Sequence, residues 1–138
     1  MIDFKNLFSG GGEKTRRRPS QDEEHKLQAA CVKWFGYAHP ELRGLLFAVP
    51  NGGRRDQATG ARLKEEGVVA GVADLILLSI RSGCGALLIE MKTGKGRQSE
   101  HQKLWQQTVE RAGYRYKVVR SVDEFRRTVE DYLWPDRG

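Results

Sequence analysis

The sequence contains few of the features that define several large classes of protein. Among its 138 residues there are only 2 cysteines, Cys31 and Cys84, too few for a disulfide framework or for a zinc cluster built on thiolates. No apolar run approaches the roughly 20 residues of a membrane-spanning helix, and residues 1–12 lack the basic leader and the apolar segment of a signal peptide. These shortages exclude a disulfide-rich secreted protein, a membrane protein and a cysteine-rich zinc finger, and we expect a small intracellular protein.

Basic residues, in contrast, are plentiful. Lys and Arg number 24 against 18 Asp and Glu, so the formal net charge is +6. An excess of positive charge favours a polyanionic partner such as nucleic acid. With 38% hydrophobic and 30% charged residues, the chain has the composition of a folded, water-soluble protein. Its length suits one domain of ordinary size rather than two.

Residues 1–19 differ in composition from the rest of the chain. They combine the glycine run 10–12 with the basic run 16–18 and end at Pro19. This composition predicts a flexible basic arm that cannot bury enough apolar surface to fold alone, followed by a single domain over residues 20–138. A solubilising tail without a specific role fits the arm equally well.

Some candidate motifs fail at a defining position. In the segment 10–15, Glu13 stands where a phosphate-binding loop needs glycine, and in the segment 83–88, Leu88 takes the place of the third glycine of a dinucleotide motif. We therefore expect no nucleotide cofactor. The histidines are not spaced as a metal triad, and we expect all three at the surface: His25, His39 and His101.

The spacing of apolar residues predicts alternating helices and strands. Helices are expected over 20–38, 54–66, 99–113 and 121–133, and strands over 44–50, 74–80, 86–92 and 114–119. Two helices begin with the spacing of a capping box, Ser20 with Glu23 and Ser99 with Gln102. This order implies an α/β fold in layers, with one central sheet and helices on its faces.

Charged residues interrupt two apolar strands at their ends. Asp74 opens one strand, and Glu90 and Lys92 lie near the end of the next, on either side of Met91. Because side chains alternate faces along a strand, Glu90 and Lys92 point the same way. If the two strands pair as a hairpin through residues 81–85, Asp74 comes close to both of them.

Two carboxylates at a sheet edge suit a hard divalent cation such as Mg²⁺, which prefers oxygen ligands and keeps some of its waters. The backbone carbonyl of Met91 offers a further oxygen. Such an ion polarises a phosphate, and Lys92 is placed to orient or activate a water or to neutralise the transition state. The alternative interpretation is an ordinary ion pair between Glu90 and Lys92. Asp74 argues against this interpretation, because three charged groups at the ends of two apolar strands are costly if unpaired.

The first predicted helix offers a fourth group. Glu24 and Gln28 are four residues apart and share a helix face, which Cys31 and Phe35 continue. An acid on that face could bind a metal directly or hold its water. The alternative is a solvated acid in the first turn, favoured by the helix dipole.

Five short segments occur in a defined order along the chain. They are Glu24-x-x-x-Gln28, Pro50-Asn51-Gly52-Gly53-Arg54-Arg55, Gly71-Val72-Ala73-Asp74, Ile89-Glu90-Met91-Lys92 and Gly96-Arg97-Gln98-Ser99-x-x-Gln102. Together they resemble the VRR-NUC family of the PD-(D/E)XK nuclease superfamily, over about residues 20–133. The ordered set is specific, whereas any one segment alone is weak. One departure from the family pattern is Ala73, where many superfamily members have proline. This difference concerns only the conformation of the backbone before Asp74.

The resemblance implies a restriction-endonuclease-like αβββαβ core, in which helices flank a central mixed sheet. It implies that Asp74 and Glu90 bind Mg²⁺ or Mn²⁺ and that Lys92 is the catalytic lysine. It also implies that Glu24 is a helix-borne acid at the site, in contact with the metal either directly or through water. Gln102 is then a supporting residue on the third helix, although an ordinary polar helix residue fits its position equally well.

Contacts to a nucleic acid follow from a separate set of residues. The turn Asn51-Gly52-Gly53 exposes backbone N–H groups to a phosphate, and Arg54 and Arg55 add charge; a simple strand-to-helix turn is the alternative. A basic rim after the second charged strand adds Lys95, Arg97 and Lys103. None of these positions suggests base reading, so we expect recognition of shape rather than sequence.

The residues and the resemblance together predict a Mg²⁺-dependent endodeoxyribonuclease. Stand-alone family members resemble phage or bacterial proteins that act as dimers on branched DNA such as four-way (Holliday) junctions. The resemblance therefore implies a cytoplasmic homodimer, in a bacterial cell or a phage-infected host, that acts in DNA repair, recombination or phage replication. Candidates for its interface include Trp34 and Trp134. The alternative is a catalytically silent nucleic-acid-binding module; a sequence-specific restriction enzyme is less favoured, because so short a chain leaves little room for a reading domain.

Overall fold

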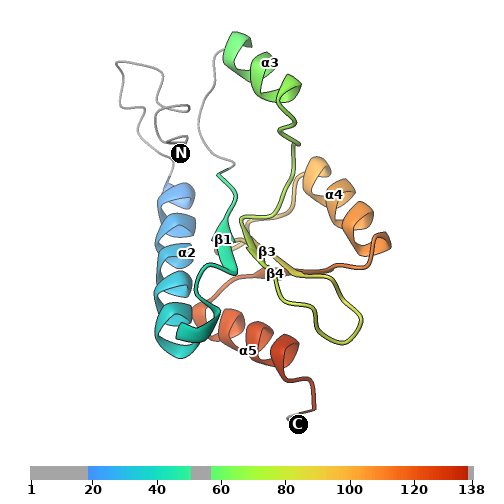
Figure 1. Cartoon of the computed structure of the whole chain (residues 1–138). Helices are drawn as coiled ribbons and strands as arrows, with labels where there is room; N and C mark the ends of the chain where they lie inside the picture. The colour runs from blue at the N-terminus through green and yellow to red at the C-terminus, as the bar shows by residue number, and fades with distance from the viewer. Residues whose placement is uncertain (1–18, 51–56, 137–138) are drawn as a thin grey trace.

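The computed structural model describes the backbone of residues 19–50 and 57–136 and the side chains of residues 21–50 and 60–136. Its elements are α2 (Pro19–Ala38), η1 (Pro40–Leu42), β1 (Leu46–Ala48), α3 (Gln57–Glu65), β2 (Leu75–Leu77), β3 (Leu87–Met91), α4 (Glu100–Arg111), β4 (Arg115–Val119) and α5 (Val122–Leu133) (Figure 1). Each predicted helix and strand is present in the predicted order, and η1 is an additional turn. Residues 1–18 of the expected arm and the side chain of Ser20, which belongs to an expected capping box, lie outside what the structure describes, whereas Pro19, which we assigned to the arm, begins α2.

The four strands form one mixed sheet in the order β1-β2-β3-β4. The pairs β1–β2 and β2–β3 are antiparallel, whereas β3 and β4 run parallel. A parallel pair needs a crossover connection, and α4 provides it. The order α2, β1, β2, β3, α4, β4 reproduces the expected αβββαβ core, with α3 inserted and α5 added.

The connection between β2 and β3 is a tight hairpin turn. Arg81 and Cys84 exchange backbone hydrogen bonds of 3.1 and 2.8 Å, and the two residues between them, Ser82 and Gly83, have φ values of 48° and 76°. Two positive φ angles in a two-residue loop define a type I′ turn, whose twist matches that of the flanking strands. The predicted hairpin through residues 81–85 is therefore confirmed.

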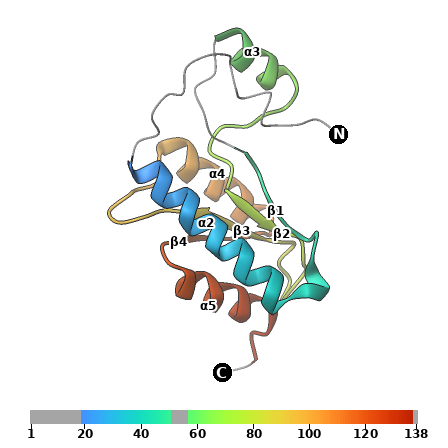
Figure 2. The same ribbon diagram turned by 90° about the vertical axis from the view of Figure 1, so that its left-hand side faces the viewer.

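Helices cover both faces of the sheet (Figure 1 and Figure 2). On one face, Leu87, Ile89 and Met91 of β3 join a buried cluster with α2 and α5, whose contributions are Cys31, Phe35, Phe125, Val129, Tyr132 and Leu133. On the other face, a smaller cluster contains Leu88 of β3, Val109 of α4 and Tyr116 of β4. The alternation along β3 places Glu90 on the second face, under α4.

The second predicted strand is shorter than expected. An apolar run over 74–80 predicted a strand covered on both faces, but β2 ends at Leu77. Beyond it, Leu78 and Ile80 are 50% and 76% exposed, because the chain leaves the sheet for the hairpin turn. The prediction was wrong for these residues. In β3, by contrast, all five residues are buried.

One histidine also differs from its prediction. His39, which we expected at the surface, is 5% exposed. Its backbone N–H donates to the Phe35 carbonyl at the end of α2, and this turns the ring inward against Trp34, Phe35 and Trp134, with ring centroids 5.3–5.5 Å apart. His25 and His101 are exposed, as predicted.

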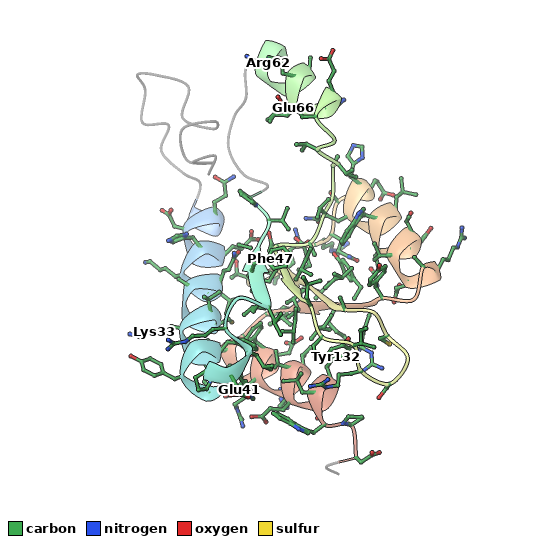
Figure 3. All side chains as sticks on the ribbon, viewed as in Figure 1. Lys33, Glu41, Phe47, Arg62, Glu66 and Tyr132 are labelled. Carbon is green, nitrogen blue, oxygen red and sulfur yellow. The ribbon has the colours of Figure 1, made fainter. Side chains whose placement is uncertain are left out.

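The remaining helix, α3, lies apart from the sheet in both ribbon views. Figure 3 shows Arg62 and Glu66 at this end of the molecule, far from Tyr132 on α5. Within the part of the chain that the structure describes, no helix is both long and apolar enough to cross a membrane.

Candidate functional site

The β2–β3 hairpin brings two acidic side chains together. Leu75 pairs with Ile89, and continuing this register by one residue sets Asp74 opposite Glu90. Directly opposite residues of an antiparallel pair share a face, with Cβ atoms about 4.5–5.5 Å apart. The two carboxyl groups therefore meet at the end of the hairpin, where the sequence predicted them.

Asp74 is held by the backbone of β3. The Met91 N–H donates to Asp74 Oδ2 over 2.7 Å, replacing the strand hydrogen bond that β2 would otherwise supply. The N–H and C=O of one strand residue point to the same side of the strand. The Met91 carbonyl therefore also faces the side on which Asp74 lies.

Gln102 on α4 is fixed at both ends of its side-chain amide. Its Oε1 accepts from the Ser99 N–H at 2.8 Å, and its own backbone N–H donates to Ser99 Oγ at 3.2 Å. This capping box, which the sequence predicted, leaves the amide nitrogen free to donate to Glu90 Oε1 at 2.7 Å. The N-terminal cap of α4 thus orients a hydrogen-bond donor at Glu90.

Two further residues contact this network: Tyr116, which was missed in the sequence, and Gln98, which stood in one of the five segments but was given no role. The Tyr116 hydroxyl donates to Glu90 Oε2 at 3.3 Å, and Gln98 Nε2 donates to that hydroxyl at 3.2 Å. Because Tyr116 lies on β4, its position depends on a parallel pairing through a helical crossover, which sequence spacing does not define. The one available signal was a tyrosine on a buried strand, whose hydroxyl needs a partner.

Lys92 and Glu24 complete the group. Lys92 Nζ lies 3.9 Å from Glu90 Oε1, and these side chains are 12% and 3% exposed. A Cβ at position 96 would lie 3.9 Å from Glu24 Oε1 and 3.7 Å from Lys92 Cδ, so Gly96 fits between the helix-borne acid and the lysine. The structure thus brings Glu24, Asp74, Glu90, Lys92 and Gln102 into one neighbourhood.

Ionisation of the acids in this neighbourhood is electrostatically unfavourable. Burial, followed by repulsion from Asp74, raises the pKa of Glu90 from 4.5 to about 8. Burial also raises the pKa of Asp74, against the opposing hydrogen bond from Met91. Burial raises the pKa of Glu24 too, whereas the Lys92 ammonium lowers it. A cation placed among these carboxylates would reverse the balance.

The donor set fits a hard divalent cation. Asp74 and Glu90 offer carboxylate oxygens, and the Met91 carbonyl faces the same side. Within residues 21–50 and 60–136, no three His, Cys, Asp or Glu side chains are grouped closely enough to hold an ion by themselves. An ion that binds through one or two carboxylates and keeps waters, as Mg²⁺ does, matches this arrangement better than one enclosed by protein ligands.

The predicted contacts to nucleic acid are only partly visible. Asn51, Gly52, Gly53, Arg54 and Arg55 lie outside the described residues. Lys95 and Arg97 are exposed on the loop from β3 to α4, while the exposed Lys103 pairs with Glu100 at 3.3 Å. Basic side chains therefore follow the acid pair along the chain and remain accessible.

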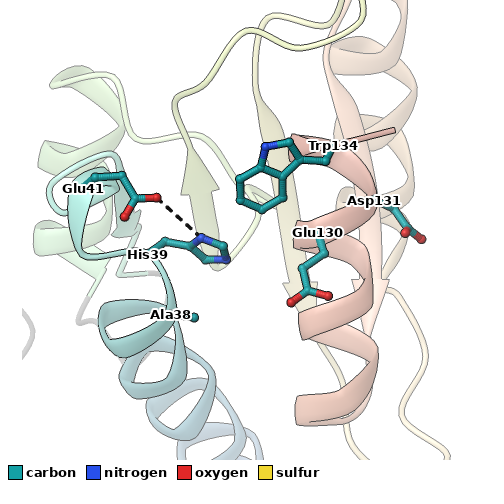
Figure 4. Close-up of a pocket in the computed structure, with 6 residues that line it drawn as sticks. All are labelled: Ala38, His39, Glu41, Glu130, Asp131 and Trp134. Carbon is teal, nitrogen blue, oxygen red and sulfur yellow. Dashed lines mark ion pairs between the residues drawn. The ribbon is translucent and has the colours of Figure 1, made fainter. Parts of the chain in front are cut away.

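A separate pocket of about 380 Å³ lies between the end of α2 and α5 (Figure 4). Its lining residues are Ala38, His39, Glu41, Glu130, Asp131 and Trp134. His39 Nδ1 lies 3.7 Å from Glu41 Oε1, and its Nε2 has no hydrogen-bond partner among the described residues. None of the residues around Glu90 lines this pocket, so it is distinct from the candidate site.

Comparisons with known proteins bear on the family and on the fold. The family model for the VRR-NUC domain matches residues 22–123. A solved structure named "VRR_NUC domain protein" shares the fold with a TM-score of 0.71 and 23% sequence identity, over 80% of this chain and 88% of that one. No curated protein sequence matches the chain significantly.

Proposed function

Because the chain belongs to the VRR-NUC family of nuclease-like domains, we propose that it is a metal-dependent endonuclease that hydrolyses DNA phosphodiester bonds. One observation carries the proposal: Asp74, Glu90 and Lys92 converge at the end of one hairpin, with Glu90 nearly buried and paired to polar donors. A purely structural ion pair between Glu90 and Lys92 does not need Asp74 beside it. A second carboxylate repels the first and raises the free-energy cost of burying the pair.

In this proposal Asp74, Glu90 and the Met91 carbonyl hold a Mg²⁺ or Mn²⁺ ion. The ion supplies positive charge that polarises the scissile phosphate and stabilises its extra negative charge. Asp74 is kept in place by the Met91 N–H and Glu90 by Gln102. These hydrogen bonds hold the two carboxylates ready for the ion.

Lys92 acts on the attacking water. Its side chain is 12% exposed and its ammonium lies 3.9 Å from Glu90, so the ammonium is placed beside the acid pair on a side chain that is largely buried. We assign it to hold the water in line with the phosphate and to offset charge that develops there. Glu24, on the other side of Gly96, accepts a hydrogen bond from water at the same site.

Branched DNA is the substrate that we propose, with four-way junctions as its representative. The basic residues Lys95 and Arg97 contact phosphates and carry no pattern for reading bases, which favours recognition of shape. Symmetric cleavage of a junction needs two active sites, and one chain supplies one. We therefore propose that the active form is a homodimer.

The decisive experiment compares cleavage of a four-way junction and a linear duplex, with Mg²⁺, with Mn²⁺ and with EDTA. We expect cleavage of the junction only when a divalent ion is present. Asp74→Ala and Lys92→Ala should lower the rate by roughly 100-fold or more while DNA binding persists. Asp22→Ala and Lys33→Ala, which remove exposed charges of the same kinds from α2, are the matched controls.

The second candidate function is a catalytically silent nucleic-acid-binding module. The basic residues support it, and the retained acids and lysine of the site argue against it. Binding of junction DNA without cleavage in either metal would establish this function instead. Cleavage that survives in both Asp74→Ala and Lys92→Ala would contradict the proposed mechanism.

A further inference from the structure

The Tyr116 hydroxyl has only one direction in which it can donate a hydrogen bond. A hydroxyl carries one hydrogen and two acceptor lone pairs. Gln98 Nε2 donates to the hydroxyl oxygen at 3.2 Å, which occupies a lone pair. The hydroxyl hydrogen is then available for Glu90 Oε2 at 3.3 Å. Gln98 thus directs the Tyr116 hydrogen at Glu90.

Gln98 is itself held in place. Its amide nitrogen also donates to Gln106 Oε1 on α4 at 2.9 Å, so both amide hydrogens are used. The ring of Tyr116 packs against Trp105 of α4, with centroids 6.1 Å apart, and the residue is 3% exposed. Neither side chain can therefore turn away from Glu90 without losing contacts on α4.

Both oxygens of Glu90 are consequently restrained by donors that have a second anchor. Gln102 holds Oε1 and is anchored by the capping box at Ser99. Tyr116 holds Oε2 and is anchored by Gln98. A carboxylate held at both oxygens keeps its plane as well as its position.

We propose that Tyr116, oriented by Gln98, is a positioning residue that fixes the plane of the Glu90 carboxylate for Mg²⁺. This inference rests on the proposed function, because it assumes that Glu90 is a metal ligand. Residues behind a metal ligand set its orientation, and their loss typically costs 10–100-fold in affinity or activity. Mg²⁺ demands near-ideal octahedral geometry, whereas Ca²⁺ accepts flexible geometry. Fixing the plane therefore favours Mg²⁺ over Ca²⁺.

The test measures apparent dissociation constants for Mg²⁺ and Ca²⁺ from the rise of the melting temperature with ion concentration, in the full chain without DNA. Tyr116→Phe should weaken Mg²⁺ binding by about tenfold and Ca²⁺ binding clearly less. The matched control is Tyr114→Phe, two residues earlier, where the side chain is 42% exposed. It should leave both constants unchanged, and melting in EDTA shows that each variant is folded.

A second variant tests whether Gln98 acts through the hydroxyl. Gln98→Ala should lower Mg²⁺ affinity in the same direction as Tyr116→Phe. The double variant should lose no more than Tyr116→Phe alone, because Gln98 has nothing left to orient. Additive losses of Mg²⁺ affinity would instead mean that the two residues act on Glu90 independently of each other.

The outcomes separate this inference from the proposed function. Wild-type protein that binds Mg²⁺ and cleaves DNA, with Tyr116→Phe indistinguishable from Tyr114→Phe, overturns the positioning role alone. Equal losses for Mg²⁺ and Ca²⁺, or additive losses in the double variant, overturn it as well. Wild-type protein without divalent-ion binding overturns the proposed function and this inference with it.

Discussion

Glu90 is a buried acid whose ionisation carries a large electrostatic cost. Its side chain is 3% exposed, and the nearest ammonium, on Lys92, is 3.9 Å away. Burial and the Asp74 carboxylate raise its pKa to about 8, so without a metal ion the folded protein holds a proton there that the unfolded chain releases near pH 4.5. Ionisation of this residue therefore opposes folding, and a site suited to bind a cation is destabilising when empty of one.

The first prediction follows from the sign of this shift. An acid with a raised pKa contributes its full stability below its ordinary pKa and loses it as the pH rises through the folded value. Without metal, wild-type stability should fall between about pH 4.5 and pH 8, and Glu90→Gln should remove most of that fall. At pH 8.5 the variant should be more stable by a few kcal/mol, because each pKa unit is worth about 1.4 kcal/mol.

Urea denaturation in EDTA at pH 5 and pH 8.5 measures this difference. Glu110→Gln, an exposed change of the same chemistry on α4, should leave the wild-type pH dependence intact. Adding Mg²⁺ should stabilise the wild type and not Glu90→Gln. Equal pH dependence in Glu90→Gln and wild type would show that Glu90 ionises without cost.

Some residues of the candidate site could be predicted from the sequence, whereas others could not. Asp74, Glu90 and Lys92 follow from local information, since a hairpin between neighbouring strands fixes their register. Tyr116 and Gln98 meet Glu90 across a parallel pairing and a loop, and no spacing rule connects them to it. The supporting role of Gln102 came from the family resemblance, and the capping box that fixes its amide was predicted separately from the spacing of Ser99 and Gln102.

Among the elements, α4 supplies the donor that fixes Oε1 of Glu90. Its first turn carries Gln102, and that turn packs against the loop before β2. Gly71 has φ +82°, and a Cβ there would overlap the His101 carbonyl and lie 2.7 Å from Gln102 N. The glycine is therefore needed both for the backbone conformation and for the close approach of α4.

The second prediction concerns this contact. Gly71→Ala should destabilise the fold by roughly 1–3 kcal/mol, through left-handed strain and overpacking, and it should also lower Mg²⁺ affinity by moving Gln102. Gly67→Ala is a matched control, because Gly67 has φ +100° with nothing within 4 Å of a Cβ. It should show the strain without the loss of metal affinity. Urea denaturation and Mg²⁺ titration of both variants provide the comparison, and equal Mg²⁺ affinities would contradict the contact argument.

The elements themselves were largely predictable, whereas their ends were not. Apolar periodicity located the helices and strands because most of them bury a face against the sheet; α3, which lies apart from the sheet, is the exception. It overestimated β2, since Leu78 and Ile80 are apolar yet exposed at the turn. It also missed the burial of His39, which depends on how α2 and α5 pack rather than on local sequence.

For the whole molecule, the third prediction is the oligomeric state. One chain contains one acid pair, and paired cuts in a four-way junction need two. We expect multi-angle light scattering to give twice the mass of the chain, in free protein or on junction DNA. A single-chain mass in both samples would exclude the proposed homodimer.

The last prediction uses the charge of the molecule as a whole. A net charge of +6 attracts DNA mainly through phosphates, so affinity should fall steeply with salt. Each lysine or arginine that contacts a phosphate contributes about one unit to the slope of log affinity against log salt. Arg97 is exposed on the loop that follows the acid pair, next to Gly96, which lies close to Glu24 and Lys92.

Arg97→Ala should therefore weaken binding to the same extent for junctions of different sequence and reduce the slope by about 1. Arg126→Ala is the control: Arg126 lies on α5, within 3.7 Å of Asp123 and 4.0 Å of Glu130, and its removal should leave the slope unchanged. Fluorescence anisotropy between 50 and 200 mM salt, about the range over which phosphate contacts dominate, measures both. A loss confined to one DNA sequence would mean that Arg97 reads a base, because a phosphate contact is the same at every sequence.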